Sequence, residues 1–339
     1  MYSDQSIIKD LRALTESFIP NRIMHRDGQI QQIRDNLAPL IDDKKPRNMF
    51  LYGPPGTGKT TLSKYVLDEL QAHVTALTSY VNCWSYSSEF KILYNILQDF
   101  KDVFIHRQGV PADELLDRLR NKARSKPCII ILDEVDHIES DKILYELLNL
   151  NVCLIMIANN ESALYSMEER VRSRTASADS ISFPAYSEQE IFDIIKDRSN
   201  LGLVSGRADT LLLKKIAALS KGDCRFAIDM LRIAADEAEK KGMEKMQPEL
   251  VDKFATKIKA ATPSAMEKLN DYQKIIYNII SDGDEIKSHE LHKKFEKLCS
   301  EKKLEIIHER TVRKHLERLE QYKLISAIGT GNGRIYSKA

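Results

Sequence analysis

The sequence has little cysteine, a single tryptophan and no long hydrophobic run. Its five cysteines are widely separated and none forms a C-x-x-C pair, so neither a zinc site nor a disulfide framework is expected. No apolar run approaches the ~20 residues that a membrane-spanning helix needs. The first residues, MYSDQSIIKD, contain no basic segment followed by an apolar one, so no signal peptide is predicted. These absences predict a cytoplasmic protein with reduced thiols.

The chain also lacks an excess of charge of either sign. Lys and Arg total 51 and Asp and Glu total 50, which gives a formal net charge of +1. The whole-chain charge therefore gives no sign of nucleic-acid binding, and any basic surface must be local. With 339 residues, of which 42% are hydrophobic, the chain is long enough for two or three domains with cores of their own.

Short apolar segments alternate with amphipathic segments in the first half of the chain. Strands are predicted in residues 47–52, 73–83, 128–136, 152–160 and 180–186, with amphipathic helices such as 87–100 and 111–125 between them. Residues 128–136 and 152–160 are continuous apolar runs, which are typical of strands covered on both faces. This alternation predicts an α/β fold with a parallel sheet of five strands.

After about residue 187 the pattern is helical only. Helices are predicted in 187–200, 208–222, 223–242 and 247–261, and then, after a linker at 262–267, in 270–281, 288–301 and 309–321, followed by two short strands around GTGNG (329–333). We therefore predict an α/β core over 1–186, a helical lid over 187–262 and a helix-and-wing domain over 263–339.

A glycine-rich loop follows the first predicted strand and precedes a helix. It matches G-x-x-x-x-G-K-[ST], the loop whose backbone N–H groups surround phosphates. Lys59 is expected to reach the β- and γ-phosphates and Thr60 to bind Mg²⁺. The residues predicted to bind the nucleotide here are Gly53, Pro54, Pro55, Gly56, Thr57, Gly58, Lys59, Thr60 and Thr61.

Acidic residues end the apolar strand at 128–136. Asp133 is expected to hold Mg²⁺ and Glu134 to polarise the attacking water. Such a pair can also merely cap a strand, but beside a phosphate loop it predicts ATP hydrolysis. Asn159 ends the next strand; if that strand lies between the strands that carry the loop and Asp133, Asn159 faces the γ-phosphate and can orient the water.

Arginines stand out at two places in the sequence, at residue 225 and at residues 170–174. Asp223 is a natural N-cap, so Arg225 lies in the first turn of a helix, where a cation opposes the helix dipole. This position indicates a partner elsewhere, such as a phosphate, although an ordinary surface arginine is equally compatible. Arg170, Arg172 and Arg174 precede the last strand, where cations can act on the γ-phosphate of a neighbouring subunit or form a solvated basic turn.

The C-terminal segment is locally basic. Residues 308–339 contain seven Lys or Arg against three acids, a surplus of four that the whole-chain charge conceals. A recognition helix here would contact duplex DNA, with a wing at the glycine turn near the backbone or minor groove; winged helices also mediate protein contacts. The predicted DNA contacts are Arg310, Thr311, Arg313, Lys314, Arg318, Asn332 and Arg334.

In order along the chain, GPPGTGKTT, ILDEVD, Asn159, RVRSR and GDCR resemble the motifs of AAA+ ATPases. HRDGQI, YVNCWSYSSEFKILYNIL and GVPADELLDRL resemble a narrower clade, the archaeal replication initiators related to origin recognition complex and cell-division-cycle loader subunits. The resemblance covers nearly the whole chain. It implies an AAA+ core, a helical lid and a C-terminal winged-helix domain.

The resemblance also implies roles for residues. Asn159 would be the first sensor and Arg225 the second, and His25 and Arg26 would lie near the adenine. Arg174 would be the trans-acting finger, with Arg170 as second choice. The region after Asn82 would hold a helical insertion that contacts DNA in this family. Trp84 departs from the family pattern, which often has arginine there; it would pack at a domain joint or stack on DNA.

The implied function is that of an ATP-dependent replication initiator. It would bind origin double-stranded DNA, use ATP/ADP and Mg²⁺ as a slow switch, and recruit or load the replicative helicase together with other initiator subunits. It would be a cytoplasmic, nucleoid-associated protein. The alternatives are a P-loop transcription regulator with a winged helix and a clamp-loader subunit, which should end instead in a helical collar.

Overall fold

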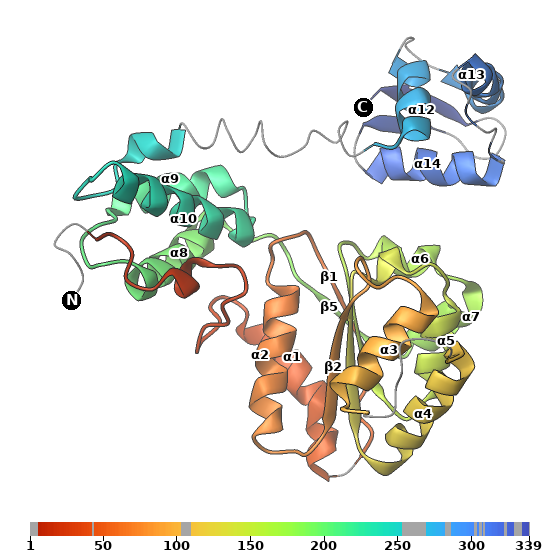
Figure 1. Cartoon of the computed structure of the whole chain (residues 1–339), viewed down its shortest axis with the longest axis horizontal. Coiled ribbons are helices and arrows are strands. Elements are labelled where there is room, and N and C mark those ends of the chain that lie inside the picture. The colour runs from red at the N-terminus through yellow and green to blue at the C-terminus, as the bar shows by residue number, and fades with distance from the viewer. Residues whose placement is uncertain are drawn as a thin grey trace. The chain divides into compact units, whose positions relative to one another are not determined.

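The chain forms two compact units, Met1–Ala255 and Thr256–Ala339 (Figure 1). The computed structural model describes residues 6–42, 44–102, 110–252, 269–281, 286–301, 304, 307, 309–321, 324–328 and 334–338. Within these residues no helix combines the length and the apolar character that crossing a bilayer requires. The predicted linker at 262–267 lies outside the described residues, as does the predicted boundary between lid and winged helix.

A parallel sheet of five strands forms the centre of the first unit, as predicted. The strands are β1 (Met49–Tyr52), β2 (Leu77–Asn82), β3 (Cys128–Asp133), β4 (Cys153–Ala158) and β5 (Asp179–Ser182), in the order β2-β3-β4-β1-β5. Every residue of β3 and β4 is buried, which explains their continuous apolar sequences. Strand β4 lies between β3 and β1, which is the condition for Asn159 to face the phosphate loop.

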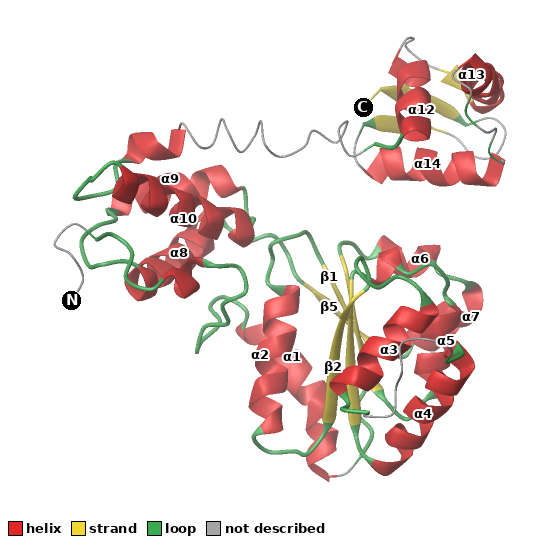
Figure 2. Cartoon of the chain, viewed as in Figure 1, coloured by secondary structure: helices red, strands yellow, loops and turns green. Residues whose placement is uncertain are grey.

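Helices cover both faces of this sheet (Figure 2). One face packs against α1 (Asp27–Leu37) and α2 (Lys59–Gln71); the other packs against α3 (Glu89–Asp99), α4 (Ala112–Ser125), α5 (Lys142–Asn149), α6 (Ser162–Ser166) and α7 (Glu169–Thr175). Successive strand residues alternate between the two cores: Ile129 and Ile131 pack with α1 and α2, whereas Ile130 and Leu132 pack with α3 to α5. Both faces of these strands are therefore buried, and polar residues such as Asp133 lie at the strand ends.

The helical lid consists of α8 (Glu188–Gly202), α9 (Thr210–Ser220) and α10 (Cys224–Lys240) among the described residues. Each helix begins at a side-chain cap. Ser187 and Glu190 form a capping box, Asp209 accepts from the Leu212 N–H, and Asp223 accepts from the Phe226 N–H, as predicted for Asp223. The predicted fourth helix at 247–261 falls largely outside the described residues.

The N-terminal segment packs on the lid helices. The 3₁₀-helix η1 (Leu11–Leu14) contacts α8 and α10, and Ile8 pairs with Leu203. The buried Arg198 of α8 donates from Nη1 to the Ala13 carbonyl and from Nη2 to the Phe18 carbonyl, at 3.2 and 3.0 Å. The segment that the predicted boundaries group with the core thus contacts the lid.

The second unit is a winged helix. Its elements are α12 (Asp271–Ser281), β6 (Ile286–Lys287), α13 (Ser288–Glu301), α14 (Glu309–Gln321), β7 (Ile325–Ile328) and β8 (Ile335–Lys338), with an antiparallel sheet in the order β6-β8-β7. The three helices and this sheet enclose their own core, which includes Ile276, Phe295, Leu316 and Leu319. The predicted wing tip at 329–333 lies outside the described residues.

Candidate nucleotide site and nucleic-acid interface

The loop between β1 and α2 adopts backbone conformations that require glycine at two positions. Gly53 and Gly56 have positive φ angles of 151° and 73°. A Cβ atom at Gly53 would lie 2.0 Å from the Phe183 carbonyl oxygen, and one at Gly56 would lie 1.9 Å from Asp223 Oδ1. Only glycine fits at either position, so the loop packs directly against the lid-side residue Asp223.

Lys59 begins α2 and is buried. Its Nζ donates to the carbonyl oxygens of Gly53 and Pro54, at 2.6 and 2.9 Å. Burial lowers the pKa of Lys59 to about 8, against the opposing attraction of Asp133. A buried ammonium of this kind lacks a full counter-charge, and phosphate oxygens would supply one.

The side chain of Asp133 accepts hydrogen bonds at both oxygens. Oδ2 accepts from the Thr60 hydroxyl at 2.6 Å and from the Tyr80 hydroxyl at 2.9 Å, and Oδ1 accepts from the Glu134 N–H at 3.0 Å. Burial and Asp133 together raise the pKa of Tyr80, so this hydroxyl keeps its proton. A hydroxyl and a carboxylate in contact are the hard oxygen donors that fit Mg²⁺.

The described residues contain no cluster of three or more His, Cys, Asp or Glu side chains that could enclose a metal. Mg²⁺ does not need such a cluster, because it retains several waters and uses one or two protein oxygens plus phosphates. Thr60 and Asp133 therefore fit Mg²⁺ better than a metal that requires an all-protein cage.

Glu134 follows Asp133 in a left-handed conformation, with φ at 57°. This conformation is uncommon for a residue with a side chain and is found often at functional sites. Burial, followed by the nearby Asp133, raises the pKa of Glu134. Asn159, directly after β4, lines the same cavity. Both predicted catalytic side chains thus lie together beside Lys59 and Thr60.

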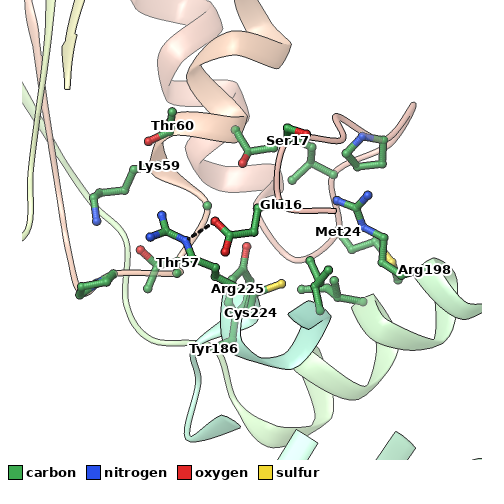
Figure 3. Close-up of a pocket in the computed structure, with 18 of the residues that line it drawn as sticks. Glu16, Ser17, Met24, Thr57, Lys59, Thr60, Tyr186, Arg198, Cys224 and Arg225 are labelled. Carbon is green, nitrogen blue, oxygen red and sulfur yellow. Dashed lines mark ion pairs between the residues drawn. The ribbon is translucent and has the colours of Figure 1, made fainter. Parts of the chain in front are cut away.

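The cavity measures about 570 Å³ and lies between core and lid (Figure 3). Three parts of the chain line it. The first is the loop 55–61 with the ends of β2, β3 and β4; the second is Tyr186, directly before the lid, with the lid residues Ile194, Asp197, Arg198, Cys224, Arg225 and Ile228; the third is the N-terminal residues Glu16, Ser17, Pro20, Arg22, Ile23 and Met24. Phosphate-loop groups at one end and apolar side chains at the other suit a nucleotide.

Arg225 also lines this cavity, and its role as a sensor of the nucleotide stays a prediction. Its Nε lies 3.0 Å from Glu16 Oε2. The adjacent Cys224 N–H donates to the Gly56 carbonyl at 3.1 Å, so the start of α10 is bound to the phosphate loop. The partner expected from the position of Arg225 on its helix is, in this structure, a carboxylate of the N-terminal segment.

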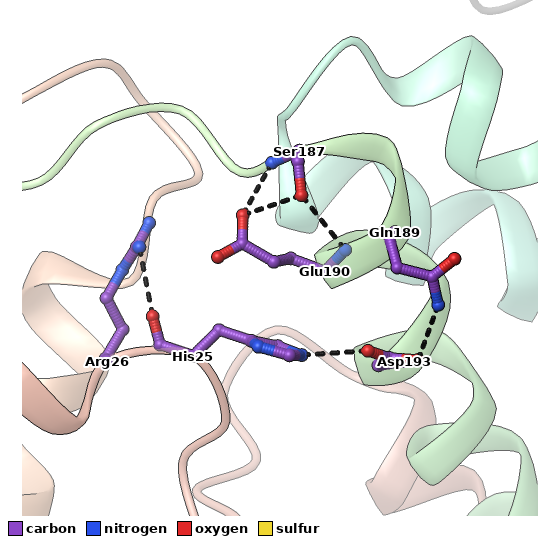
Figure 4. Close-up of polar contacts among 6 residues, drawn as sticks. All are labelled: His25, Arg26, Ser187, Gln189, Glu190 and Asp193. Carbon is purple, nitrogen blue, oxygen red and sulfur yellow. Dashed lines mark hydrogen bonds and ion pairs between the residues drawn. The ribbon is translucent and has the colours of Figure 1, made fainter.

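His25 and Arg26 do not line the cavity. Figure 4 shows their polar contacts, with the His25 ring directed at Asp193 of α8. Arg26 is buried; its Nε donates to the Thr57 carbonyl at 3.2 Å and its Nη2 to the Pro184 carbonyl at 2.8 Å, and its guanidinium lies 3.7 Å from the centre of the Tyr186 ring. His25 Nε2 lies 3.1 Å from Asp193 Oδ2. Arg26 thus joins the phosphate loop to the segment before the lid.

The three predicted trans-acting arginines lie on α7 rather than in a turn. Arg174 donates to the Tyr145 hydroxyl at 3.4 Å and lies 4.7 Å from its ring centre. Arg170 lies 5.4 Å from the same ring and pairs with Glu168 at 2.7 Å. Arg172 is exposed. None of the three lines the cavity of its own chain, and action on a neighbouring subunit stays a prediction.

Several polar residues of the site were not predicted from the sequence, and two of them, Glu16 and Tyr80, contact predicted site residues. Glu16 belongs to an irregular segment far from any motif, and nothing in its local sequence indicates a partner on α10. Tyr80 precedes the family-like Asn82 by two residues, and both line the cavity. The only usable signal was its place near the end of a strand adjacent to β3.

Helix α14 presents most of the predicted DNA-binding residues of the second unit. Thr311, Arg313, Lys314 and Arg318 are exposed, whereas Val312, Leu316 and Leu319 are buried in the domain core. Both oxygens of Glu320 lie 3.0 Å from Nη2 of Arg334. Asn332 and the side chain of Arg310 lie outside the described residues.

Trp84 lies on the surface of the core. It is 59% exposed, and its ring contacts His137 edge-on, with 4.3 Å between ring centres. His137 belongs to η3 (Val135–His137), directly after Asp133 and Glu134. Trp84 is therefore not a buried packing residue, and it lies close to the catalytic end of the sheet.

Comparisons with known proteins cover the whole chain. Family models match an AAA domain at 42–164, a Cdc6 AAA+ ATPase-type lid domain at 192–255 and a CDC6 C-terminal winged-helix domain at 270–339. An ORC1-type DNA replication protein of Halobacterium salinarum is 32% identical over 336 residues, covering 98% of this chain and 94% of that protein. One from Thermococcus onnurineus is 30% identical and covers 97% and 86%.

Solved structures agree with this result. The ORC1 protein of Aeropyrum pernix in complex with DNA aligns with a TM-score of 0.75 and 25% identity, covering 100% of this chain and 94% of that one. Cdc6p from Pyrobaculum aerophilum, at 22% identity and a TM-score of 0.68 over 98% and 94%, shares the fold. The AAA+ core, the lid and the winged helix thus occur together in these relatives, and the chain belongs to the family of ORC1-type DNA replication proteins.

Proposed function

We propose that this chain is an ATP-dependent DNA replication initiator that binds double-stranded DNA at replication origins. One observation carries the proposal. The chain combines a cavity lined by a phosphate loop and a helical lid with a winged-helix domain whose helix α14 exposes basic side chains. A relative of similar length is an ORC1 protein seen in complex with DNA. A clamp-loader subunit would lack this winged-helix unit.

The nucleotide-binding role belongs to the cavity between core and lid. Lys59 and the backbone of the loop 53–60 would bind the phosphates, and the apolar end near Ile23 and Ile228 would receive the base. Thr60 and Asp133 would hold Mg²⁺, which when bound neutralises charge on the phosphate oxygens. Structures of the Aeropyrum pernix ORC2 protein with ADP and ADPNP support nucleotide binding in this fold.

Hydrolysis would depend on residues at the ends of β3 and β4. Glu134 would polarise the attacking water and Asn159 would orient it, because both line the cavity beside Thr60. Arg225 would connect lid position to the terminal phosphate. We propose that hydrolysis is slow and acts as a switch between two lid positions. Arg174, held at Tyr145, would contact the nucleotide of an adjacent initiator subunit.

The DNA-binding role belongs chiefly to α14. Its exposed Thr311, Arg313, Lys314 and Arg318 would contact phosphates and base edges in the major groove. Because Arg334 is paired with Glu320, it would contribute less to phosphate binding than an unpaired cation. The AAA+ core would contact the same duplex, and the assembled protein would recruit the replicative helicase in the cytoplasm, at the nucleoid.

The test is to map the genomic sites that the protein occupies and to repeat the mapping with Lys59→Ala. An initiator should occupy replication origins, and loss of nucleotide binding should change that occupancy. Occupancy of promoters alone would favour a transcription regulator with the same domains and would contradict the proposal.

A further inference from the structure

Glu16 stands in the nucleotide cavity with its carboxylate against Arg225 (Figure 3). The distance from Arg225 Nε to Glu16 Oε2 is 3.0 Å. Both side chains remain half exposed, 57% for Arg225 and 45% for Glu16, so the pair can open without unfolding either segment. It joins the N-terminal segment to the first turn of α10.

The backbone on both sides of Glu16 is fixed to the lid. The buried Arg198 binds the carbonyls of Ala13 and Phe18, and its guanidinium lies 4.7 Å from the centre of the Phe18 ring. Glu16 lies between these two anchored residues. Its position beside Arg225 is therefore a consequence of the fold rather than of a free chain end.

The charges around Arg225 make Glu16 its direct counter-ion. Asp223 caps α10 through the Phe226 N–H, and Asp229 pairs with Arg232 at 3.3 Å. Burial raises the pKa of the Glu16 carboxyl, Arg225 lowers it, and the nearby Asp229 and Asp223 raise it. Asp223 and Asp229 thus lie near Glu16 and have partners of their own, and an anionic phosphate entering the cavity would compete with Glu16 for Arg225.

We propose that Glu16 sets the preference of this site between ATP and ADP by competing with the γ-phosphate for Arg225. This inference rests on the proposed nucleotide-binding function. A nucleotide without a γ-phosphate leaves the Glu16–Arg225 pair intact. A triphosphate must draw Arg225 away from Glu16, and breaking this ion pair costs part of the binding free energy. Glu16 therefore weakens the binding of ATP more than that of ADP.

The experiment measures the affinities of the full-length protein for ADP and for a non-hydrolysable ATP analogue by calorimetry. Glu16→Gln keeps the size of the side chain and removes its charge. It should increase the ratio of triphosphate to diphosphate affinity by about 2- to 5-fold, the range expected for opening a half-exposed ion pair. Glu249→Gln, at an exposed lid residue that does not line the cavity, should leave the ratio unchanged.

The double variant separates this mechanism from a general change in charge. In an Arg225→Ala background, Glu16→Gln should no longer alter the ratio. An unchanged ratio in Glu16→Gln, or the same change with and without Arg225, would overturn the inference while leaving the proposed function intact. If the wild-type protein binds neither nucleotide, the proposed function itself fails.

Discussion

The hydroxyl of Thr60 lies 2.6 Å from Asp133 Oδ2, where it donates a hydrogen bond across the gap between α2 and β3. These residues are 73 positions apart in sequence, and parallel strand order brings them together. The same carboxylate oxygen accepts the Tyr80 hydroxyl. The two residues predicted to bind magnesium thus contact each other, and Tyr80 donates a hydrogen bond to one of them.

Replacing Tyr80 with phenylalanine should lower the affinity of the nucleotide complex for Mg²⁺ by about 10-fold, because groups that orient a metal ligand typically contribute 10- to 100-fold. Calorimetric titration of Mg²⁺ into the ATP complex measures this. Nucleotide affinity in the presence of EDTA should not change. Tyr165→Phe, at an exposed ring, is the matched control. Equal Mg²⁺ affinities for wild type and Tyr80→Phe would contradict the assignment.

The binding of ATP should become coupled to proton uptake at alkaline pH. The pKa of Lys59 is about 8 in the free protein because of burial, and phosphate oxygens would raise it by stabilising the ammonium. Below pH 8 the lysine is charged before and after binding. Above pH 8 it is neutral in the free protein and takes up a proton on binding, so affinity falls as pH rises.

Calorimetry in buffers with different ionisation enthalpies counts these protons. At pH 9 we expect about one proton taken up per ATP bound, and close to none at pH 7. The pH 7 measurement serves as the internal control. Equal proton uptake at both values would show that Lys59 does not meet the phosphates.

Glu134→Gln should separate hydrolysis from binding. The substitution removes the base and keeps the shape, so the hydrolysis rate should fall by about 100-fold or more, whereas ATP affinity stays within about 3-fold. Rates are measured by phosphate release and affinities by calorimetry. Glu161→Gln, at an exposed residue outside the cavity, is the control. An unchanged rate would assign the base to another residue.

Arg26→Ala should destabilise the nucleotide-free fold, because the buried guanidinium binds the Thr57 and Pro184 carbonyls. We expect a loss of about 3–6 kcal/mol of unfolding free energy, since hydrogen bonds to charged groups contribute ~1.5–3 kcal/mol each. Denaturant unfolding without nucleotide measures it. If stability is unchanged and only ATP affinity falls, the residue contacts the base and the structural role is wrong.

Removing the charge of Arg313 or Lys314 should weaken the binding of duplex DNA and reduce its salt dependence. Each lost phosphate contact should lower the slope of log affinity against log salt by about one. Lys293→Ala, at an exposed lysine on α13 of the same domain, is matched in charge. Salt titrations by fluorescence anisotropy with the full-length chain give the slopes. The same slope for all variants would place the DNA elsewhere.

Most of the fold could be predicted from local sequence patterns, because apolar runs and helix caps involve only residues that are close together in the sequence. Continuous apolar runs identified β3 and β4, and N-caps such as Asp223 marked helix starts. The position of Asn159 could be predicted on one condition, that its strand lies between β1 and β3. The phosphate loop, Asp133 and Glu134 lie together because carboxyl ends of parallel strands meet at one edge.

The remaining site residues depend on contacts that sequence spacing does not encode. Arg26 lies beside the loop but points to carbonyls and to Tyr186 instead of into the cavity. Glu16 meets Arg225 because the N-terminal segment packs on the lid, where Arg198 binds the carbonyls on both sides of Glu16. Arg334 is predicted to contact DNA from the wing, yet it pairs with Glu320, fourteen residues earlier.

We expect a nucleoside triphosphate to bind the core and the lid at once, through Lys59 and Arg225. The most direct measurement is the affinity of the full-length Lys59→Ala protein for ATP, by calorimetry at pH 7, alongside the wild type. We predict that the wild type binds ATP and that the variant shows no measurable binding while remaining folded. Wild-type affinity in Lys59→Ala would show that the nucleotide does not bind at the phosphate loop.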